Sequence, residues 1–367
     1  MPSWKRGAKN TFLILAEEEY KTLATTKEAL DKHGYQHLTV LARGESDAEE
    51  FTYGRNRIEA SAHARKKPHA PGTPGTSGKF PLPVGISPTP NHDLVNNGGK
   101  TISALNYKNI YVAGDTAWSA GDKQSIDTAL LAIMTDPKLT GIIQQYFPGS
   151  VISNTFNGSV NLAIPVPATV SRGDIDHLLQ QALSAGLIIG DFETTVFNFL
   201  LPPGTVLTDA AAPGGGAIND AAATTHSKRG HAEDKASSLG GLGGYHGSVH
   251  LGGQRYYFAV GVYSQILANG QENGIVAFNL PWKNVTATFY HEMQEVRTDA
   301  DVEDVNNQLP GAAIGWISAS GEEIGDFPVF EDPNLHSVFV EITLTAGGTA
   351  PVQLIYSNRA HGPEVPA

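Results

Sequence analysis

Sequence patterns of buried strands and of amphipathic helices alternate along most of this 367-residue chain. Residues 171–186 have the clearest helical pattern, because apolar residues from Ile175 to Ala182 recur on one face and Gly186 follows as a stop. Residues 194–201 form a short apolar run closed by two prolines, which is typical of a buried strand. This alternation predicts an α+β fold, with a mixed α/β arrangement of helices and strands around a shared core.

A segment rich in proline and glycine interrupts this pattern. Seven of the 22 prolines lie between Pro68 and Pro90, so we expect a linker at residues 58–92. The chain after it, residues 93–367, is long enough for a domain with a sizeable core. Within this domain, residues 208–244 consist largely of Ala, Gly, Ser and Thr, and we expect a mobile loop there.

The N-terminal part, residues 1–57, has the pattern of a small β-α-β segment. Apolar runs at residues 11–16 and 37–42 predict two strands. Residues 17–33 predict a helix between them, with Gly34 as its stop. The sequence leaves open whether this segment docks on the main domain or stands apart from it.

Composition excludes several classes of site and partner. The chain has no cysteine, which excludes disulfides, cysteine-ligated zinc, iron–sulfur clusters and a cysteine nucleophile. Its net charge of −12, without a basic stripe, argues against nucleic acid as a partner. No apolar run reaches membrane-spanning length, and the run at residues 12–16 is too short for a signal peptide. We therefore expect a soluble chain that is cytoplasmic or exported by another route, and its oligomeric state stays open.

The motif that most directly suggests chemistry is H-E-x-x-E at residues 291–295. Residues four apart share one face of a helix, so His291 and Glu295 can both reach one metal ion. Glu292 is then placed to act as the general base on a metal-bound water. Asp299 lies one turn further along, as a third ligand or as a residue that orients the ligands.

A metal site on this helix needs a ligand from elsewhere in the chain. Glu323 and Asp326 lie in a short glycine-flanked acidic stretch downstream. One histidine with several carboxylates accommodates zinc, and also manganese, iron, calcium or magnesium. The alternative is a solvent-exposed helix face on which a glutamate pairs with Arg297.

Two other segments contain candidate residues. In the glycine-rich residues 243–253, His246 is a candidate ligand or transition-state donor, and Tyr245 is a candidate donor; the alternative is a hairpin with exposed histidines. Ser119 lies in A-W-S-A-G, which lacks the first glycine of a nucleophile elbow, so it more simply caps a helix. A serine hydrolase is the weaker third class of function.

Five stretches stand in a characteristic order, and they read NNGGKTISALNYKNIYVAGDTAWS, GGYHGSVH, YYFAVGVY, HEMQEVRTDAD and GWISASGEEIGD. Their order and spacing resemble the phosphate-induced protein 1 / Exordium family over roughly the last three quarters of the chain. The resemblance implies a zincin-like core domain whose H-E-x-x-E helix carries over as His291, Glu292 and Glu295, followed by the acidic pieces TDAD and EIGD. Plant members of the family are secreted to the cell wall and linked to growth control, which implies an extracellular location. This chain lacks their cysteines and a signal peptide, which suggests a microbial relative.

Taken together, the motif and the resemblance favour an enzyme. We expect a zinc-dependent, metallopeptidase-like hydrolase acting on a peptide or protein substrate, with Glu292 activating the water and residues 208–244 covering the cleft. The ligands would be His291, Glu295 and one of Asp299, Glu323 and Asp326. The alternative is a non-catalytic Exordium-like binding or structural protein that holds calcium or no metal.

Overall fold

The computed structural model describes residues 80–209, 237–307, 309–331 and 335–367, together with four short strands nearer the N-terminus. The chain divides into two compact units; the first holds those four strands, and the second holds the chain from residue 71 onward. Helices and strands occur together in the second unit, which confirms the predicted α+β class. The zincin-like core stays a prediction. Among the described helices, none combines the length and apolar character needed to cross a bilayer.

The first unit contains a four-stranded sheet in the order β1-β2-β3-β4. β2 and β3 lie where the sequence predicts strands, and they pair in parallel, as strands joined by a crossover do. The helix predicted at residues 17–33 lies outside the described residues. At the two edges of the sheet, β1 pairs antiparallel with β2, and β4 pairs antiparallel with β3. The sequence analysis did not predict these two edge strands. The four strands are β1 (Ser3–Arg6), β2 (Thr11–Leu15), β3 (Leu38–Ala42) and β4 (Phe51–Tyr53).

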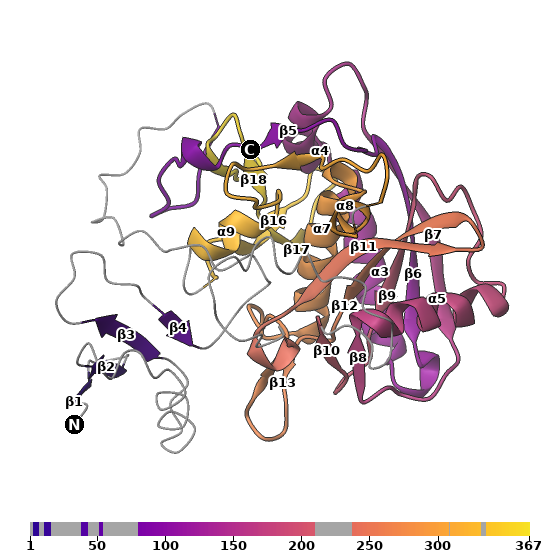
Figure 1. Cartoon of the computed structure of the whole chain (residues 1–367), viewed down its shortest axis with the longest axis horizontal. Helices are drawn as coiled ribbons and strands as arrows, with labels where there is room; N and C mark the ends of the chain where they lie inside the picture. The colour runs from indigo at the N-terminus through magenta and orange to yellow at the C-terminus, as the bar shows by residue number, and fades with distance from the viewer. Residues whose placement is uncertain are drawn as a thin grey trace. The chain divides into compact units, whose positions relative to one another are not determined.

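The second unit is organised around a five-stranded sheet in the order β11-β12-β9-β6-β7 (Figure 1). Four of these strands run parallel to one another, whereas the edge strand β11 is antiparallel to β12. Gly252 and Gly253 form the turn between these two strands at φ values of 59° and 81°, which glycine adopts without strain. The strands are β6 (Ala104–Val112), β7 (Ser153–Leu162), β9 (Thr195–Leu200), β11 (Gly244–Leu251) and β12 (Gln254–Gly261).

Helices cover both faces of this sheet. All of β9 is buried, as its continuous apolar run indicates. On one face, the stripe from Ile175 to Ala182 of α5 packs into a cluster with Phe197, which confirms the helix predicted there. On the other face, Phe289 of α7 and Ile126 of α3 lie in a second cluster. The helices are α3 (Ala120–Thr135), α4 (Pro137–Ile143), α5 (Ile175–Ser184), α7 (Pro281–Thr298), α8 (Val302–Asn306) and α9 (Asp326–Glu331).

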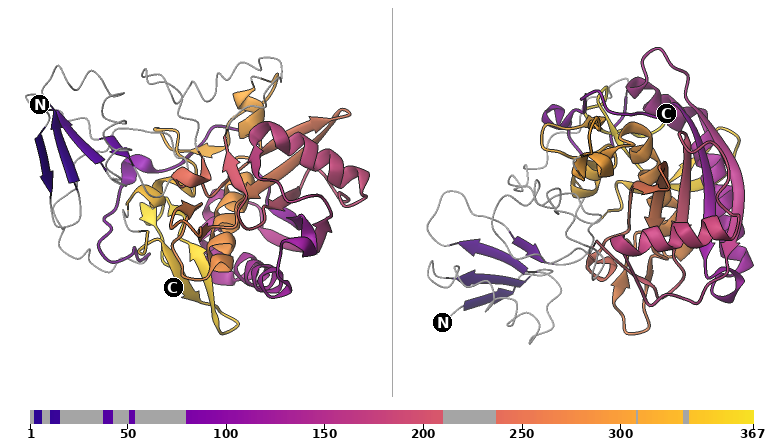
Figure 2. Two further views of the ribbon diagram at one scale, coloured as in Figure 1. Left: turned by 90° about the horizontal axis from the view of Figure 1, so that it is seen from below. Right: turned by 45° about the vertical axis from the view of Figure 1, so that its right-hand side comes forward.

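Helix α7 lies between the sheet and the hairpin formed by β16 (Phe339–Thr343) and β17 (Thr349–Gln353) (Figure 1; Figure 2). From Asn284 onward every residue of this helix is buried, although most of these side chains are polar. Several of the polar groups find partners in the interior: the Asn284 amide donates to the Ser264 carbonyl, and Arg297 donates to a backbone carbonyl of β7. Such satisfied hydrogen bonds make the burial of a polar helix tolerable.

The described part of the expected linker belongs structurally to the second unit. The Val365 amide donates to the Pro81 carbonyl at 2.8 Å, and the Thr89 amide donates to the His361 carbonyl at 2.6 Å. Residues 80–92 therefore pair with the C-terminal segment of the chain. Their prolines suit this path, because proline has no backbone N–H that would need an acceptor.

Most of the loop expected at residues 208–244, namely residues 210–236, lies outside the described residues. At its C-terminal end, Ser238 is fully buried. The Ser238 hydroxyl accepts from the Leu207 amide at 2.9 Å and donates to the Asn273 side chain at 2.6 Å. This end of the segment is therefore fixed to the strands beside it.

Short elements complete the second unit. Four two-stranded pairs form besides the β16–β17 hairpin. Their strands are β10 (Val206–Thr208) with β8 (Thr169–Ser171), β13 (Gln265–Ile266) with β14 (Glu272–Asn273), β15 (Trp316–Ile317) with β5 (Val95–Asn96), and β18 (Tyr356–Ser357) with β19 (Gly362–Pro363). The 3₁₀ turns are η1 (Pro90–His92), η2 (Gly114–Thr116), η3 (Gln144–Tyr146), η4 (Arg172–Asp174) and η5 (Ser238–Gly240).

Gly261 allows the close approach of β12 and α7. A Cβ atom at this position would lie 2.9 Å from Cε2 of Phe289. We therefore expect Gly261→Ala to lower the free energy of unfolding by about 1–3 kcal/mol. In a chain that already carries Phe289→Leu, Gly261→Ala should lower the free energy of unfolding by less than it does in the parent. The ring atoms that would conflict with the new Cβ atom are gone in that chain. Urea denaturation of the four chains measures this coupling.

The matched control is Gly141→Ala in α4, where a Cβ atom would meet nothing within 4 Å. This change should leave the free energy of unfolding unchanged or raise it slightly, because alanine in a helix is more stable than glycine by roughly 0.5–1 kcal/mol. A loss in the control as large as that at Gly261 would contradict the packing explanation.

Candidate metal centre

The H-E-x-x-E segment lies in the interior of the second unit. His291, Glu292 and Glu295 are 0%, 1% and 3% exposed. The alternative of a solvent-exposed helix face is therefore wrong. Arg297 does not pair with a glutamate there; it hydrogen-bonds to the carbonyl of Ser153. Burial of this kind is costly for carboxylates unless a cation, a proton or hydrogen bonds compensate them.

The helical spacing brings three donor side chains of α7 together. His291 Nε2 lies 3.0 Å from Glu295 Oε1 and 4.0 Å from Glu292 Oε1. Neither contact has the geometry of a hydrogen bond, and Nε2 has no hydrogen-bond partner. An imidazole nitrogen beside two buried carboxylates suits a shared positive charge, which a proton or a metal ion can supply.

A glutamine from the neighbouring hairpin orients the His291 ring. Gln353 of β17 donates from Nε2 to the Gly325 carbonyl at 2.6 Å, so its Oε1 faces His291 Nδ1 at 2.8 Å. Nδ1 is therefore the donor, and Nε2 is left free toward the carboxylates. A ring nitrogen fixed in this way is the usual support of a metal-binding histidine.

Gly325 brings the acidic loop against this pair. A Cβ atom on Gly325 would lie 2.4 Å from His291 Nδ1, so only glycine fits. Its amide lies 3.2 Å from Glu295 Oε1 and donates to it. Sequence analysis missed both Gln353 and Gly325; the only signal for the glycine was its place beside the acidic stretch.

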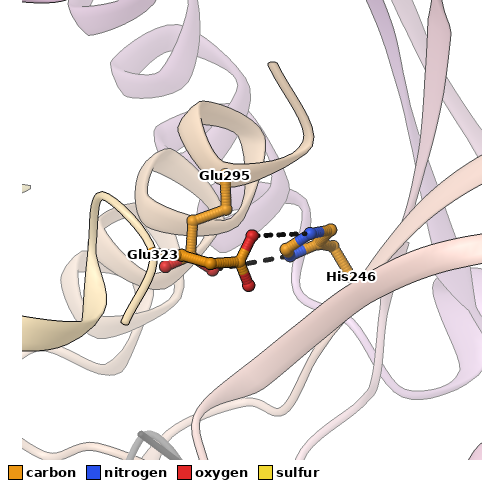
Figure 3. Close-up of side chains that lie close together, drawn as sticks. All are labelled: His246, Glu295 and Glu323. Carbon is orange, nitrogen blue, oxygen red and sulfur yellow. Dashed lines mark ion pairs between the residues drawn. The ribbon is translucent and has the colours of Figure 1, made fainter. Parts of the chain in front are cut away.

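His246 approaches the same carboxylates from the edge strand β11 (Figure 3). Its Nδ1 lies 3.4 Å from Glu295 Oε2 and 3.5 Å from Glu292 Oε2, and its Nε2 lies 3.5 Å from Glu323 Oε1. The residue is 6% exposed, so the alternative of an exposed hairpin histidine is wrong for His246. The structure thus brings this predicted residue together with those of α7.

Glu323 and Asp326 belong to the loop that precedes α9 and to the start of that helix. The Glu323 amide donates to Asp326 Oδ2 at 3.0 Å. Burial raises the pKa values of both carboxyl groups well above the usual range of a carboxyl group. The nearby charge of Glu295 raises both pKa values further. Both predicted residues therefore lie within electrostatic reach of the motif.

Asp299 ends α7 on the same side. Its Oδ1 accepts from the Gly315 amide at 2.8 Å, and its Oδ2 has no hydrogen-bond partner. Burial raises the pKa of Asp299 to about 6, although the Gly315 amide and the His246 charge oppose this. Asp299 belongs to neither of the two groups of donor atoms that lie close together, so its part in the centre stays a prediction.

The charges of the centre act on one another strongly. Burial alone would lower the pKa of His291, but the charges of Glu295 and Glu292 raise it to about 10. Burial would raise the pKa of Glu295, but His291 and His246 lower it to about 2. Burial raises the pKa of Glu292, against the opposing effect of His291. Without a cation, protonated histidines partly neutralise this cluster.

The donor set fits a divalent metal ion. Two groups, His291–Glu292–Glu295 and His246–Glu295–Glu323, each offer donor atoms that lie within 4.8 Å of one another. Ligands of a tetrahedral ion at about 2.1 Å stand about 3.4 Å apart, close to the 3.0–3.5 Å contacts at His291 and His246. Four buried atoms of these groups have no hydrogen-bond partner: His291 Nε2, His246 Nε2, Glu292 Oε1 and Glu323 Oε1.

The remaining candidates lie outside this centre. Tyr245 alternates with His246 along β11 and points to the opposite face, where its ring packs against Arg172; it is not a donor to the site. His250 is exposed and contacts Asp304. Ser119 accepts from the Asp122 amide as the N-cap of α3, so its simpler interpretation is confirmed.

Comparison of the chain with models of known protein families, with curated proteins and with solved structures finds no match. The Exordium resemblance therefore stays a prediction. Function has to be argued from the geometry of this centre.

The pKa of Asp299 gives a pH-dependent prediction for the metal-free protein. Its folded pKa of about 6 exceeds the ordinary value of 3.8, so the folded chain holds more protons between these values. Stability contributed by Asp299 is therefore present at low pH and lost as pH rises from about 4 to 6. We expect Asp299→Asn to raise the free energy of unfolding by about 1–3 kcal/mol at pH 7 and by little at pH 3.5.

Urea denaturation with a chelator present, from pH 3.5 to 8, measures the difference between variant and parent. Asp191→Asn is the control of opposite sign, because hydrogen bonds from Thr194 and Glu193 lower the pKa of exposed Asp191. Its replacement should destabilise the chain as pH rises above about 4. A pH-independent effect of Asp299→Asn would contradict the assigned cause.

Proposed function

We propose that this chain is a metal-dependent hydrolase of the metallopeptidase type, with zinc or another divalent cation at the centre on α7. The observation that carries the proposal is the buried set His291, Glu295 and Glu292, with a ring nitrogen oriented toward carboxylates and left without a partner. The Exordium resemblance extends the proposal to a zincin-like core and to a peptide or protein substrate.

His291 and Glu295 would hold the ion, with Asp326 or Glu323 from the acidic loop. A bound divalent cation would polarise a substrate carbonyl and lower the pKa of a water molecule. Gln353 keeps the His291 donor nitrogen facing the ion by fixing its other nitrogen. Zinc suits two imidazoles with carboxylates, and the oxygen-rich set also accepts manganese or iron.

Glu292 is the proposed general base. Its Oε1 has no hydrogen-bond partner, and burial raises its pKa, which moves the carboxylate toward the range in which a base works near neutral pH. The same oxygen lies 4.0 Å from His291 Nε2, beside the proposed ligands. Glu292 can therefore take a proton from a water held beside the ligands and return it to a leaving amine.

One observation favours a second function, a structural metal centre. The three α7 donors are at most 3% exposed, and structural metal sites are closed whereas catalytic sites keep an open position. In this alternative the ion ties α7 to β11 and to the acidic loop, and the chain acts by binding or assembly. Calcium or zinc would then contribute to folding directly.

Glu292→Gln separates the two functions. We expect the variant to keep its metal and its thermal unfolding temperature but to lose about 10²–10⁴-fold in the rate of peptide hydrolysis, because the amide cannot accept the proton. Zinc-loaded parent and variant are compared on a peptide library, with metal content measured on the same samples. The control is Glu341→Gln, because the Glu341 side chain lies at the surface in an ion pair with Lys283. This variant should hydrolyse the peptides at the rate of the parent.

Hydrolysis by Glu292→Gln at the parent rate would overturn the role of Glu292. Stoichiometric metal without hydrolysis by the parent would support the structural alternative. Absence of any metal, with no change of unfolding temperature on adding zinc or calcium, would contradict both functions.

A further inference from the structure

We propose that the centre holds two divalent cations, bridged by the carboxylate of Glu295. This rests on the metal-binding function proposed above and extends it by a second site. His291 would serve one cation, and His246 and Glu323 would serve the other.

Glu295 presents its two oxygens to two different histidines. Oε1 lies 3.0 Å from His291 Nε2, on α7 itself, whereas Oε2 lies 3.4 Å from His246 Nδ1, on β11. A carboxylate that offers one oxygen to each of two donor groups has the geometry of a bridging ligand. Paired catalytic metals stand about 3.5–4 Å apart, a separation that a single carboxylate can span.

The second group has its own histidine and its own loop carboxylate, and it shares Glu295 with the first. His246 reaches the centre from the sheet edge, its side chain is 4% exposed, and its Nε2 has no partner. This nitrogen faces Glu323 Oε1 at 3.5 Å, and that oxygen also lacks a partner (Figure 3). One cation bound at His291 and Glu295 would leave both atoms without a hydrogen-bond partner.

Charge favours cation binding at this centre. Three carboxylates, those of Glu292, Glu295 and Glu323, face His246 and His291 in the two groups of donor atoms. Buried carboxylates persist only when they are paired or bind metal.

The test counts zinc per chain by native mass spectrometry, after metal removal and titration with zinc alone. We expect two zinc ions in the parent. We expect one in His246→Ala and one in His291→Ala, because each variant loses the terminal histidine of one site. Glu295→Ala should lose both, because it removes the bridge. His250→Ala is the matched control on β11, since its exposed ring contacts Asp304 outside the centre, and it should keep two.

A second readout excludes zinc bound at surface histidines. Manganese replaces zinc, and electron paramagnetic resonance detects the magnetic coupling of two ions that share a carboxylate. The coupled signal should appear in the parent and in His250→Ala, and it should be replaced by an uncoupled signal in His246→Ala. Circular dichroism checks folding, and Glu323→Gln substitutes for His246→Ala if that variant does not fold.

Each other outcome separates the two proposals. One ion in the parent, kept in His246→Ala and lost in His291→Ala, would overturn the second site and leave the proposed function standing. One ion lost in both variants would make His246 a ligand of a single cation and would also overturn the second site. No ion in the parent would overturn both proposals.

Discussion

The burial of ionisable side chains on α7 is the constraint on which the structure of the second unit depends. A helix whose carboxylates lie in the interior has to be compensated from several directions, because an isolated buried charge costs several kcal/mol. The chain supplies this with His246 from the sheet edge, with the Gly325 amide from the acidic loop and with Gln353 from the hairpin. Each comes from a different part of the sequence, so the centre forms only when the whole unit is folded.

The surrounding elements hold the centre rigidly. α7 packs against β12 through the close contact of Phe289 with Gly261, and its outer side contacts β17. On the far side of the helix, Arg297 is buried and donates to β7. Donor atoms carried by packed helices and strands keep their positions better than donors on loops. The Glu323–Asp326 segment comes from the loop before α9 and the start of that helix, and the Gly325 amide fixes it to Glu295.

Sequence alone predicted the local geometry of the centre, because helical periodicity places His291 and Glu295 on one face wherever the helix lies. It also predicted Glu323 and Asp326 from their acidic surroundings. It could not predict Gln353, since the role of that residue depends on the hairpin lying against α7. Nor could it decide the burial of the motif: a helix rich in Thr, Asn, Gln and Glu is typical of an exposed surface, and only its tertiary hydrogen bonds show otherwise.

Protons and metal ions compete for the same interior. Burial opposes a charged His291, but the charges of Glu295 and Glu292 raise its pKa to about 10, and burial raises the pKa of Glu323 and Asp326. Without a cation, all three groups therefore favour their protonated forms. The proposed cation would replace these protons, because metal ligands must be deprotonated to bind. Metal binding would therefore exchange one form of charge compensation for another within an already defined arrangement of donors.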